Sequence, residues 1–477
     1  MAIDARCVGL LRPARRLDML GSLLRSPLAT PPLCRLDPIT GCCFPMKNNH
    51  ASKPLHPVPG PCELRWGALS LSQFLANYWQ QQALVLRGFV AQESVNTPLD
   101  ALIARAADAD VASRLIRCQD DRWTMQHGPF DRLPGLSKKH WTVLLQGMDR
   151  CMGQAYRLRE AFCFLPHARI DDVMVSVASP GGGVGAHLDA YDVFLIQGLG
   201  LRRWRWGYQR EQSFQADRPL KLLNHFKPQY EAVLEPGDAL YLPPNWAHEG
   251  TALSACSTWS VGFRAPSRHE FLAQFLLEAS ESVAGPNPRY QDRSLRATRK
   301  PGRIPAELRN QLRQWALDFR SDTKTFERAL GRFLSEPAPN AWFQVPKSTL
   351  SFDRWLSLAR KRGLALHPAS RMVYDRHAVW FNGELAGKPQ PLLCALADAR
   401  RVDPQKMQTL SEKKMQALSE EHSTTTLSNA PISSDNTPSR DGVASECKKT
   451  VEFQPLFEGL FAWYRQGWIV ISGAEDS

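Results

Sequence analysis

The chain has 477 residues, of which 43% are hydrophobic, 22% are charged and 14 are tryptophan. This length suggests roughly two to four domains of ~100–200 residues each, and the apolar content excludes a largely disordered chain. The formal net charge of +12 invites a nucleic-acid partner, but composition alone does not show the clustered basic residues that phosphate binding requires. We therefore interpret the charge as an ordinary solvated surface, with nucleic-acid contact only incidental.

Cysteine usage and hydropathy point to a cytoplasmic enzyme. The 11 cysteines are scattered and none forms a Cys-X-X-Cys pair, which favours reduced thiols over disulfides or a zinc site. No run of about 18 apolar residues is present, so no membrane-spanning helix is expected.

Residues 1–45 hold six arginines, no lysine and three aspartates. An arginine-rich, acid-poor start is also typical of an organelle transit peptide. We expect residues 1–55 to be a disordered N-terminal extension. A second interpretation is that the start codon has been assigned too early and that the protein begins near Met46.

The apolar spacing over residues 66–90 predicts a helix followed by a strand, at the beginning of a catalytic domain that we expect over 56–266. Residues 173–177 are β-branched and apolar enough for a buried strand. The glycine-rich turn at 180–185 then lets the chain pass close to a ligand, because glycine adopts backbone angles that are closed to other residues.

Three potential metal ligands follow this turn. His187 and Asp189 are two residues apart, so on an extended segment their side chains project to the same face, and His248 comes 61 positions after His187. Two histidines and one carboxylate are typical of an Fe(II) site with open positions for an organic co-substrate and oxygen. Zinc fits less well because structural zinc takes four protein ligands. Manganese or nickel, as in a cupin isomerase, is an alternative metal.

The strands around these ligands predict a small barrel. Residues 193–196 and 202–206 are predicted to form a hairpin, residues 239–242 a short strand with His248 just past its end, and residues 257–263 the closing strand. Short strands separated by glycine and proline turns are typical of an antiparallel barrel or a double-sheet jelly roll.

A co-substrate with a carboxylate, such as 2-oxoglutarate, needs a cationic partner, and the fork of an arginine donates two parallel hydrogen bonds to a carboxylate. Arg202 and Arg203 are adjacent on a predicted strand, so one points inward and the other outward. The pattern does not say which.

Several segments resemble the bacterial ribosomal oxygenases of the JmjC group, in particular the members that hydroxylate an arginine. The resemblance is carried by residues 169–176, 180–194, 200–205 and 261–266, and less specifically by 126–130 and 379–384. It implies a mixed α+β fold: a JmjC/cupin double-stranded β-helix barrel with flanking helices, a helical dimerisation region and a C-terminal winged-helix-like domain.

The resemblance also implies roles for single residues. His187, Asp189 and His248 would bind Fe(II), and Arg202 would hold the far carboxylate of 2-oxoglutarate near Ser176. No catalytic residue beyond the metal centre is implied. Relatives carry a serine where this chain has Ala178, which bears on co-substrate affinity. Tyr191 and Asp192 continue the motif and are candidates for the substrate pocket, with core packing as the alternative for Tyr191.

Beyond the barrel, apolar spacing predicts helices over 267–284 and about 305–334. The resemblance makes 267–340 a dimerisation region, while packing within one chain is the alternative. Residues 341–477 are expected to form the winged-helix-like domain, with a disordered insertion at about 402–449 that is rich in serine, threonine and asparagine.

The implied activity is Fe(II)- and 2-oxoglutarate-dependent hydroxylation, by O2, of an arginine β-carbon in large-subunit ribosomal protein sixteen. Two other classes stay open: a JmjC-group oxygenase that acts on a histidyl residue, a methylated lysine or RNA, and a cupin module that binds without turnover. A pocket lined by carboxylates would favour arginine, and a neutral amide-lined pocket would favour histidine.

Overall fold

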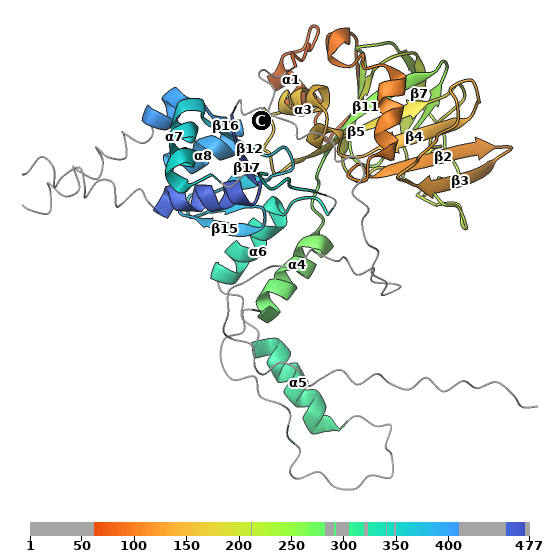
Figure 1. Ribbon diagram of the computed structural model, residues 1–477. Coiled ribbons are helices and arrows are strands. Elements are labelled where there is room, and N and C mark those ends of the chain that lie inside the picture. The colour runs from red at the N-terminus through yellow and green to blue at the C-terminus, as the bar shows by residue number, and fades with distance from the viewer. Residues whose placement is uncertain are drawn as a thin grey trace, which may run out of the picture. The chain divides into compact units, whose positions relative to one another are not determined.

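The computed structural model describes residues 62–210, 212–281, 291, 305–318, 323–339, 341–347, 350–409 and 455–472 (Figure 1). The predicted extension 1–55 lies outside the described residues. Of the predicted insertion, residues 402–409 are ordered, as the end of a strand and a short helix, and 410–454 lie outside the description. None of the described helices has the length and apolar character needed to cross a membrane.

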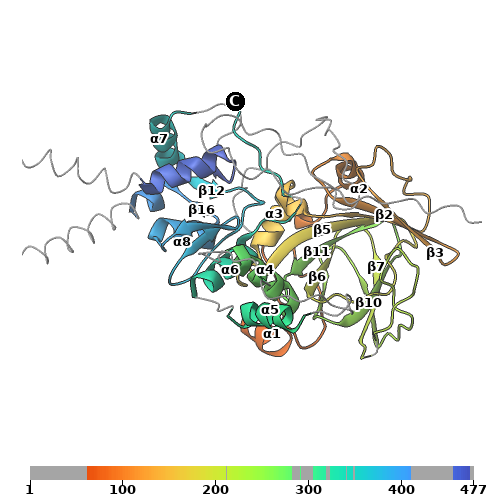
Figure 2. The ribbon, with the colours of Figure 1, turned by 90° about the horizontal axis from the view of Figure 1, so that it is seen from below.

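An antiparallel sheet of eight strands in the order β1-β9-β6-β11-β5-β4-β2-β3 forms the frame of the first half. Its strands are β1 (Leu84–Leu86), β2 (Ser113–Gln119), β3 (Arg122–His127), β4 (Trp141–Leu145), β5 (Ile170–Ala178), β6 (Asp192–Gln197), β9 (Ala239–Leu242) and β11 (Cys256–Phe263). A second sheet has the order β10-β7-β8, with β10 (Trp246–Ala252), β7 (Arg202–Tyr208) and β8 (Tyr230–Leu234). Figure 2 shows β7 and β10 beside β6, β11 and β5. The predicted two-sheet barrel is thus confirmed.

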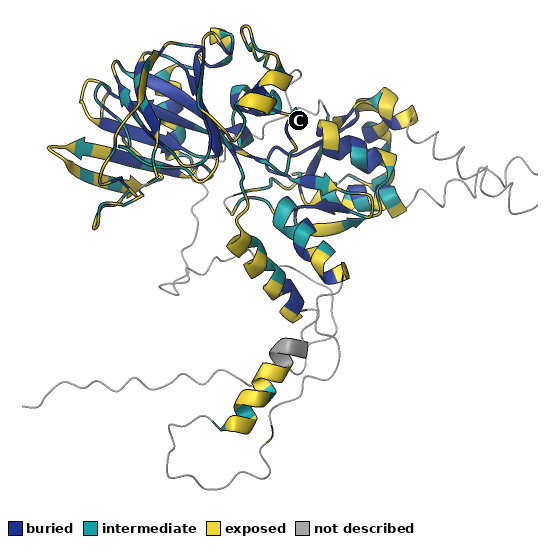
Figure 3. Ribbon diagram, turned by 180° about the vertical axis from the view of Figure 1, so that it is seen from behind, coloured by how far each residue is buried: buried dark blue, intermediate teal, exposed yellow. Residues whose placement is uncertain are grey.

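Strand β6 is apolar on both faces because each face packs against a different layer. Val193 and Leu195 pack with Trp204 and Trp206 of β7 between the two sheets. On the other face, Phe194 joins the aromatic core beneath α1 (Leu71–Asn77), α2 (Leu99–Ala104) and α3 (Gly153–Glu160). A continuous apolar run is the signature expected of a strand that is covered on both sides. Figure 3 shows the resulting buried band through the large sheet.

Two local predictions were wrong. The segments 193–196 and 202–206 are strands, but β6 belongs to the large sheet and β7 to the small one, so they do not form a hairpin. Likewise, His248 does not follow a strand end. Pro243 and Pro244 end β9, Asn245 adopts a left-handed φ of 65°, and β10 begins at once with Trp246, so His248 lies on a strand.

Helices α4 (Arg268–Glu281), α5 (Ala306–Asp318) and α6 (Thr323–Ser335) follow the barrel, and α5 and α6 are helical as predicted for 305–334, of which 319–322 lie outside the described residues. Phe271 of α4 packs against Phe326 and Phe333 of α6, with ring centroids 5.8 and 5.6 Å apart. Glu278 of α4 is buried and forms an ion pair with Arg332 of α6. Helix α6 is therefore tied to α4 by apolar and charged contacts together.

The C-terminal part has two three-stranded sheets, β16-β12-β17 and β13-β14-β15, packed with helices around one core. The elements are α7 (Phe352–Arg362), β12 (Leu364–Leu366), β13 (Met372–Tyr374), β14 (Val379–Phe381), β15 (Glu384–Gly387), α8 (Pro391–Ala399), β16 (Arg401–Val402), a helix at 455–465 and β17 (Ile469–Ile471). Local signals fix α7: Ser351 accepts a hydrogen bond from the Arg354 N–H as N-cap, and Gly363 ends the helix with a φ of 84°.

Candidate metal and co-substrate site

The structure brings His187, Asp189 and His248 together, although His248 comes from a different part of the chain. Ligand atoms of the three side chains lie within 4.8 Å of one another, an arrangement that could hold a metal ion. The backbones of His187 and His248 exchange two N–H···O hydrogen bonds of 3.0 Å, and Asp189 O accepts a third, of 2.8 Å, from Asn245 N. Main-chain hydrogen bonds thus hold the three residues together.

Both imidazoles are oriented by a second hydrogen bond. Nδ1 of His187 lies 3.0 Å from Gly185 O, and Nδ1 of His248 lies 3.0 Å from Trp246 O. A carbonyl requires that Nδ1 carry the proton, which leaves the Nε2 lone pair of each ring free for a metal. These Nε2 atoms lie 4.0 and 3.6 Å from Asp189 Oδ2.

Burial keeps His248 in the form that can bind a metal. Its side chain is 2% exposed, and this burial, together with the nearby His187, lowers the pKa of His248 to about 4. At neutral pH the ring is therefore uncharged, so a metal does not compete with a proton at this position.

The glycines of the preceding turn allow the close approach of backbones that seats the ligands. Gly185 has a φ of 76°, in the left-handed region that favours glycine. A Cβ on Gly183 would lie only 2.4 Å from the carbonyl oxygen of Gly250 on β10. A side chain at Gly183 would separate the turn from β10 and so displace His187 from His248, whereas one at Gly185 would meet Leu222 and Trp123.

A cavity of about 340 Å³ opens beside the three residues. Its wall includes Arg202, Ser176 and Tyr191, which are candidates from the sequence, and also residues that sequence reasoning had not assigned: Arg114, Gln146, Asp171, Asp172, Met174 and Thr258. Asp172, Met174 and Ser176 alternate along β5, so strand periodicity from Ser176 was a signal that could have found Asp172.

Arg202, not Arg203, is the arginine that points into the cavity. It is 4% exposed, and its guanidinium donates to Ser176 Oγ at 3.3 Å and lies 3.6 Å from Cys256 Sγ. Within the described part of the chain, its Nε has no hydrogen-bond partner. On the opposite face of β7, Arg205 instead forms an ion pair with Glu249. A buried cation with an unused donor is suited to an anionic ligand.

Ala178, where a serine was expected, is paired with Cys256 across β5 and β11. The thiol of Cys256 is thus the neighbour that contacts Arg202 at this end of the cavity. Sulfur is a weaker hydrogen-bond partner than a hydroxyl oxygen, so Arg202 is restrained less tightly here.

Of the remaining candidates, Tyr191 lines the cavity but Asp192 does not. Tyr191 is 42% exposed, and burial of its hydroxyl together with the adjacent Asp189 raises its pKa. Asp192 is fully buried, accepts from the Tyr241 hydroxyl at 2.7 Å and pairs with Arg169 at 3.3 Å. Its role is to join β6 to its neighbours: Val193 and Leu195 line the cavity, so the side chain of Asp192 lies on the other face of the strand, with Phe194.

Asp172 is the buried acid of the cavity wall. Its Oδ2 accepts from Gln146 Nε2 at 2.8 Å and lies 3.9 Å from Arg150 Nη2. Burial, with the nearby charges of Asp149 and Asp171, raises its pKa to about 6. A carboxyl group with a raised pKa in a cavity is typical of a functional position.

Comparisons with known proteins agree with this geometry. Residues 157–271 match the model of the JmjC domain family, and residues 318–421 match that of the ROXA-like winged helix. The ribosomal protein uL16 3-hydroxylase of Escherichia coli (strain K12) is 34% identical over 333 residues, which cover 69% of this chain and 89% of that protein.

Solved structures are similar over nearly their whole length. The X-ray structure of E. coli YcfD has a TM-score of 0.66 and 28% identity, covering 86% of this chain and 99% of that one. The structure of YcfD, a ribosomal oxygenase, in complex with cobalt and 2-oxoglutarate has a TM-score of 0.64 and 28% identity, covering 86% and 100%. The chain described here belongs to the family of JmjC-domain ribosomal oxygenases that includes the uL16 3-hydroxylase of E. coli.

Proposed function

We propose that this protein is an Fe(II)- and 2-oxoglutarate-dependent dioxygenase that hydroxylates the β-carbon of an arginine in large-subunit ribosomal protein sixteen, uL16. The observation that carries the proposal is the pairing of the His187, Asp189 and His248 cluster with a buried arginine across one cavity. A related protein with that activity and a related structure with cobalt and 2-oxoglutarate support it. A ribosomal protein substrate implies a cytoplasmic location.

In this proposal the chain's own residues hold and orient the reactants. His187, Asp189 and His248 bind the metal on one side, and Arg202, with Ser176 beside it, binds the far carboxylate of 2-oxoglutarate. When bound, Fe(II) and 2-oxoglutarate supply the oxidising chemistry that puts one oxygen atom of O2 on the substrate carbon while 2-oxoglutarate is converted to succinate and CO2. The cavity walls exclude water and hold the target C–H bond.

The preference for arginine is supported by the acids of the cavity wall. Asp171 and Asp172 both line the cavity, and Gln146 is the amide next to them. Two carboxylates bind the planar, charged guanidinium of an arginine better than they bind the neutral imidazole of a histidine. A cavity lined by amides alone would have favoured histidine.

The deciding experiment incubates the full-length protein with Fe(II), ascorbate, 2-oxoglutarate and uL16 or a peptide from it. A gain of one oxygen atom on an arginine, mapped by fragment masses and dependent on 2-oxoglutarate, is the expected result. Succinate formation without that gain would keep the oxygenase and discard this substrate. If no succinate forms either, the binding-module alternative takes its place.

Substrate affinity should depend on pH through Asp172. Because its pKa is about 6, its carboxylate is mostly protonated below that pH and charged above it. The KM for a cationic peptide is therefore expected to fall as the pH rises from about 5 to about 7, since the charged form attracts the guanidinium. Asp172→Asn should raise KM at neutral pH and flatten this dependence; an unchanged profile would exclude Asp172 from substrate binding.

Asp172 should also destabilise the fold at neutral pH. A folded-state pKa raised above the reference value of 3.8 means that Asp172 stabilises the fold when protonated and that this contribution is lost as the pH rises through about 6. Asp172→Asn is therefore expected to increase the free energy of unfolding at pH 8 by about 3 kcal/mol. Urea denaturation at pH 8 and pH 4 measures it, and the gain should be absent at the lower pH.

We further propose a homodimer formed through the helices that follow the barrel. Leucines of α4 and α5 are exposed at 39–57%, an unusual amount of apolar surface for a monomer: Leu272, Leu276, Leu277 and Leu312. Figure 3 shows the described residues 306–314 of α5 as mostly exposed. Sedimentation should give a dimer for the wild type and a monomer for Leu276→Glu, with Leu253→Glu, an exposed leucine of the barrel, as the control.

A further inference from the structure

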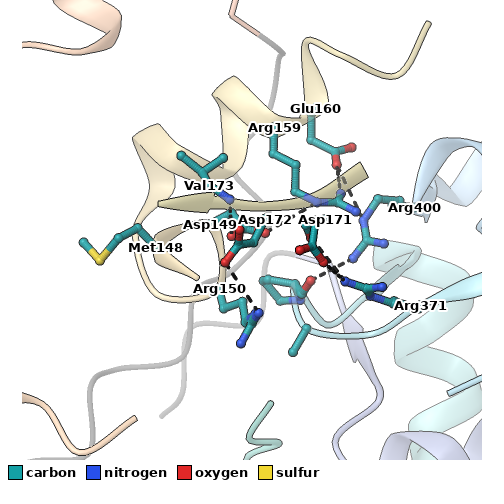
Figure 4. A network of polar contacts seen from close by, with 12 residues as sticks. Met148, Asp149, Arg150, Arg159, Glu160, Asp171, Asp172, Val173, Arg371 and Arg400 are labelled. Carbon is teal, nitrogen blue, oxygen red and sulfur yellow. Dashed lines mark hydrogen bonds and ion pairs between the residues drawn. The ribbon is translucent and has the colours of Figure 1, made fainter. Parts of the chain in front are cut away.

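An arginine of the C-terminal part contacts the wall of the proposed substrate cavity. Nη2 of Arg371 donates to Asp171 Oδ1 at 2.9 Å and to Asp171 O at 3.3 Å (Figure 4). The side chain of Arg371 is 13% exposed. Asp171 stands at the start of β5 and lines the cavity. A residue 200 positions away in sequence thus holds one of the two carboxylates of this wall.

Arg371 is itself held in place. Its N–H donates to Asn382 Oδ1 at 2.8 Å, and Asn382 N donates back to Arg371 O at 2.9 Å. Asn382 is buried and has a left-handed φ of 50°, at the turn between β14 and β15. These two bonds anchor the backbone from which the guanidinium of Arg371 reaches Asp171.

Two more contacts join the same regions. The guanidinium of Arg400, which is 2% exposed, lies 3.6 Å from Glu160 of α3, and His167 Nε2 lies 3.0 Å from Asp398 O. Arg159, next to Glu160, pairs with Asp149 at 3.4 Å, and Asp149 Oδ1 accepts from Val173 N of β5 at 3.0 Å. Figure 4 shows this series of contacts running from Arg400 to β5. The C-terminal part therefore supports the beginning of β5, directly at Asp171 and through Asp149 at Val173.

The two neighbouring acids are supported differently. Asp172 is buried and contacts Gln146 and Arg150 of the barrel domain, whereas the side chain of Asp171 is 48% exposed and its ion pair is with Arg371. A half-exposed aspartate without such a partner samples several rotamers. With Oδ1 engaged by Arg371, the other oxygen, Oδ2, is free to face a ligand in the cavity.

We propose that Arg371 is a positioning residue for the protein substrate: it fixes Asp171 at the cavity rim so that this carboxylate, with Asp172, receives a cationic side chain. The inference rests on the proposed function and extends it, since it makes the winged-helix part a component of the substrate site. Co-substrate binding is not involved, because Ser176, which contacts Arg202 of β7, lies five residues along β5 from Asp171.

The test compares Arg371→Ala, Arg371→Lys, Asp171→Asn and the double variant Arg371→Ala/Asp171→Asn in the full chain, with uL16 peptide as substrate. Arg371→Ala is expected to raise the peptide KM about tenfold while kcat and the KM for 2-oxoglutarate stay within about twofold. Arg371→Lys should recover part of the loss, and the double variant should be no worse than Arg371→Ala. Arg376→Ala, which removes an exposed arginine that hydrogen-bonds to the neighbouring His377, is the matched control.

The outcomes separate the two proposals. If the wild type hydroxylates uL16 but the peptide KM is unchanged in Arg371→Ala, the positioning role is overturned and the proposed function stands. Should the wild type not hydroxylate uL16, the proposed substrate fails, and amide hydrogen exchange at residues 170–174 decides the inference. Faster exchange there in Arg371→Ala supports it and unchanged exchange overturns it. If Arg371→Ala does not fold, Arg371→Lys and Asp171→Asn give the same readouts.

Discussion

Asp189→Ala is expected to abolish hydroxylation, lowering kcat/KM by about 1,000-fold or more, because a catalytic metal contributes several kcal/mol to transition-state stabilisation. Asp189 is the only carboxylate of the cluster, and its Oδ2 lies 4.0 and 3.6 Å from the two imidazole Nε2 atoms. Without it, two neutral imidazoles face the ion, and the charge that balances Fe(II) is lost. Affinity for the metal should fall together with activity.

Metal content and product formation are measured on the same samples. Elemental analysis should give about one iron per chain for the wild type and far less for Asp189→Ala, with the fold unchanged by circular dichroism. Glu249→Gln is the matched control: this acid follows His248 directly but pairs with Arg205 on the opposite face of the strand. It should keep iron and activity within about twofold. Full iron binding in Asp189→Ala would show that the metal site lies elsewhere.

The sequence predicted the members of the cluster better than the strands that hold them. The two-residue spacing of His187 and Asp189 and the glycine turn before them are local, so pattern alone could identify them. Strand pairing is not local. Residues 193–196 and 202–206 read as a hairpin, yet the turn between them carries the chain from the large sheet to the small one. Periodicity reports that a strand exists and which side is buried, but not its partner.

The substrate side of the cavity was harder to predict for a related reason. Asp172 is two and four residues before the inward-facing Met174 and Ser176, so alternation identifies it once β5 is known to line a cavity. Arg114 comes from β2 and Gln146 from just past the end of β4, elements that had no sequence motif. The contact of Arg371 with Asp171 depends on how two domains pack, which no periodicity encodes. Such contacts are visible only in three dimensions.

Arg202→Ala is expected to raise the KM for 2-oxoglutarate by about 100-fold, because removal of one partner from a buried, hydrogen-bonded charge pair costs about 2–5 kcal/mol. Arg202 is 4% exposed, and its Nε has no partner among the described residues, so the fork is available to a carboxylate. Arg202→Lys keeps the charge but not the paired donors, and should recover only part of the affinity.

The measurement is succinate formation against 2-oxoglutarate concentration at saturating peptide. Arg203→Ala is the matched control, since Arg203 is the next residue on β7 and does not line the cavity. An equal rise in KM for both variants would indicate a general loss of strand structure. Cys256→Ser provides a second check: a hydroxyl next to Arg202 replaces the weaker thiol contact and restores the kind of polar group that Ala178 lacks. Its effect on the KM for 2-oxoglutarate should therefore be small and in the opposite direction, towards tighter binding.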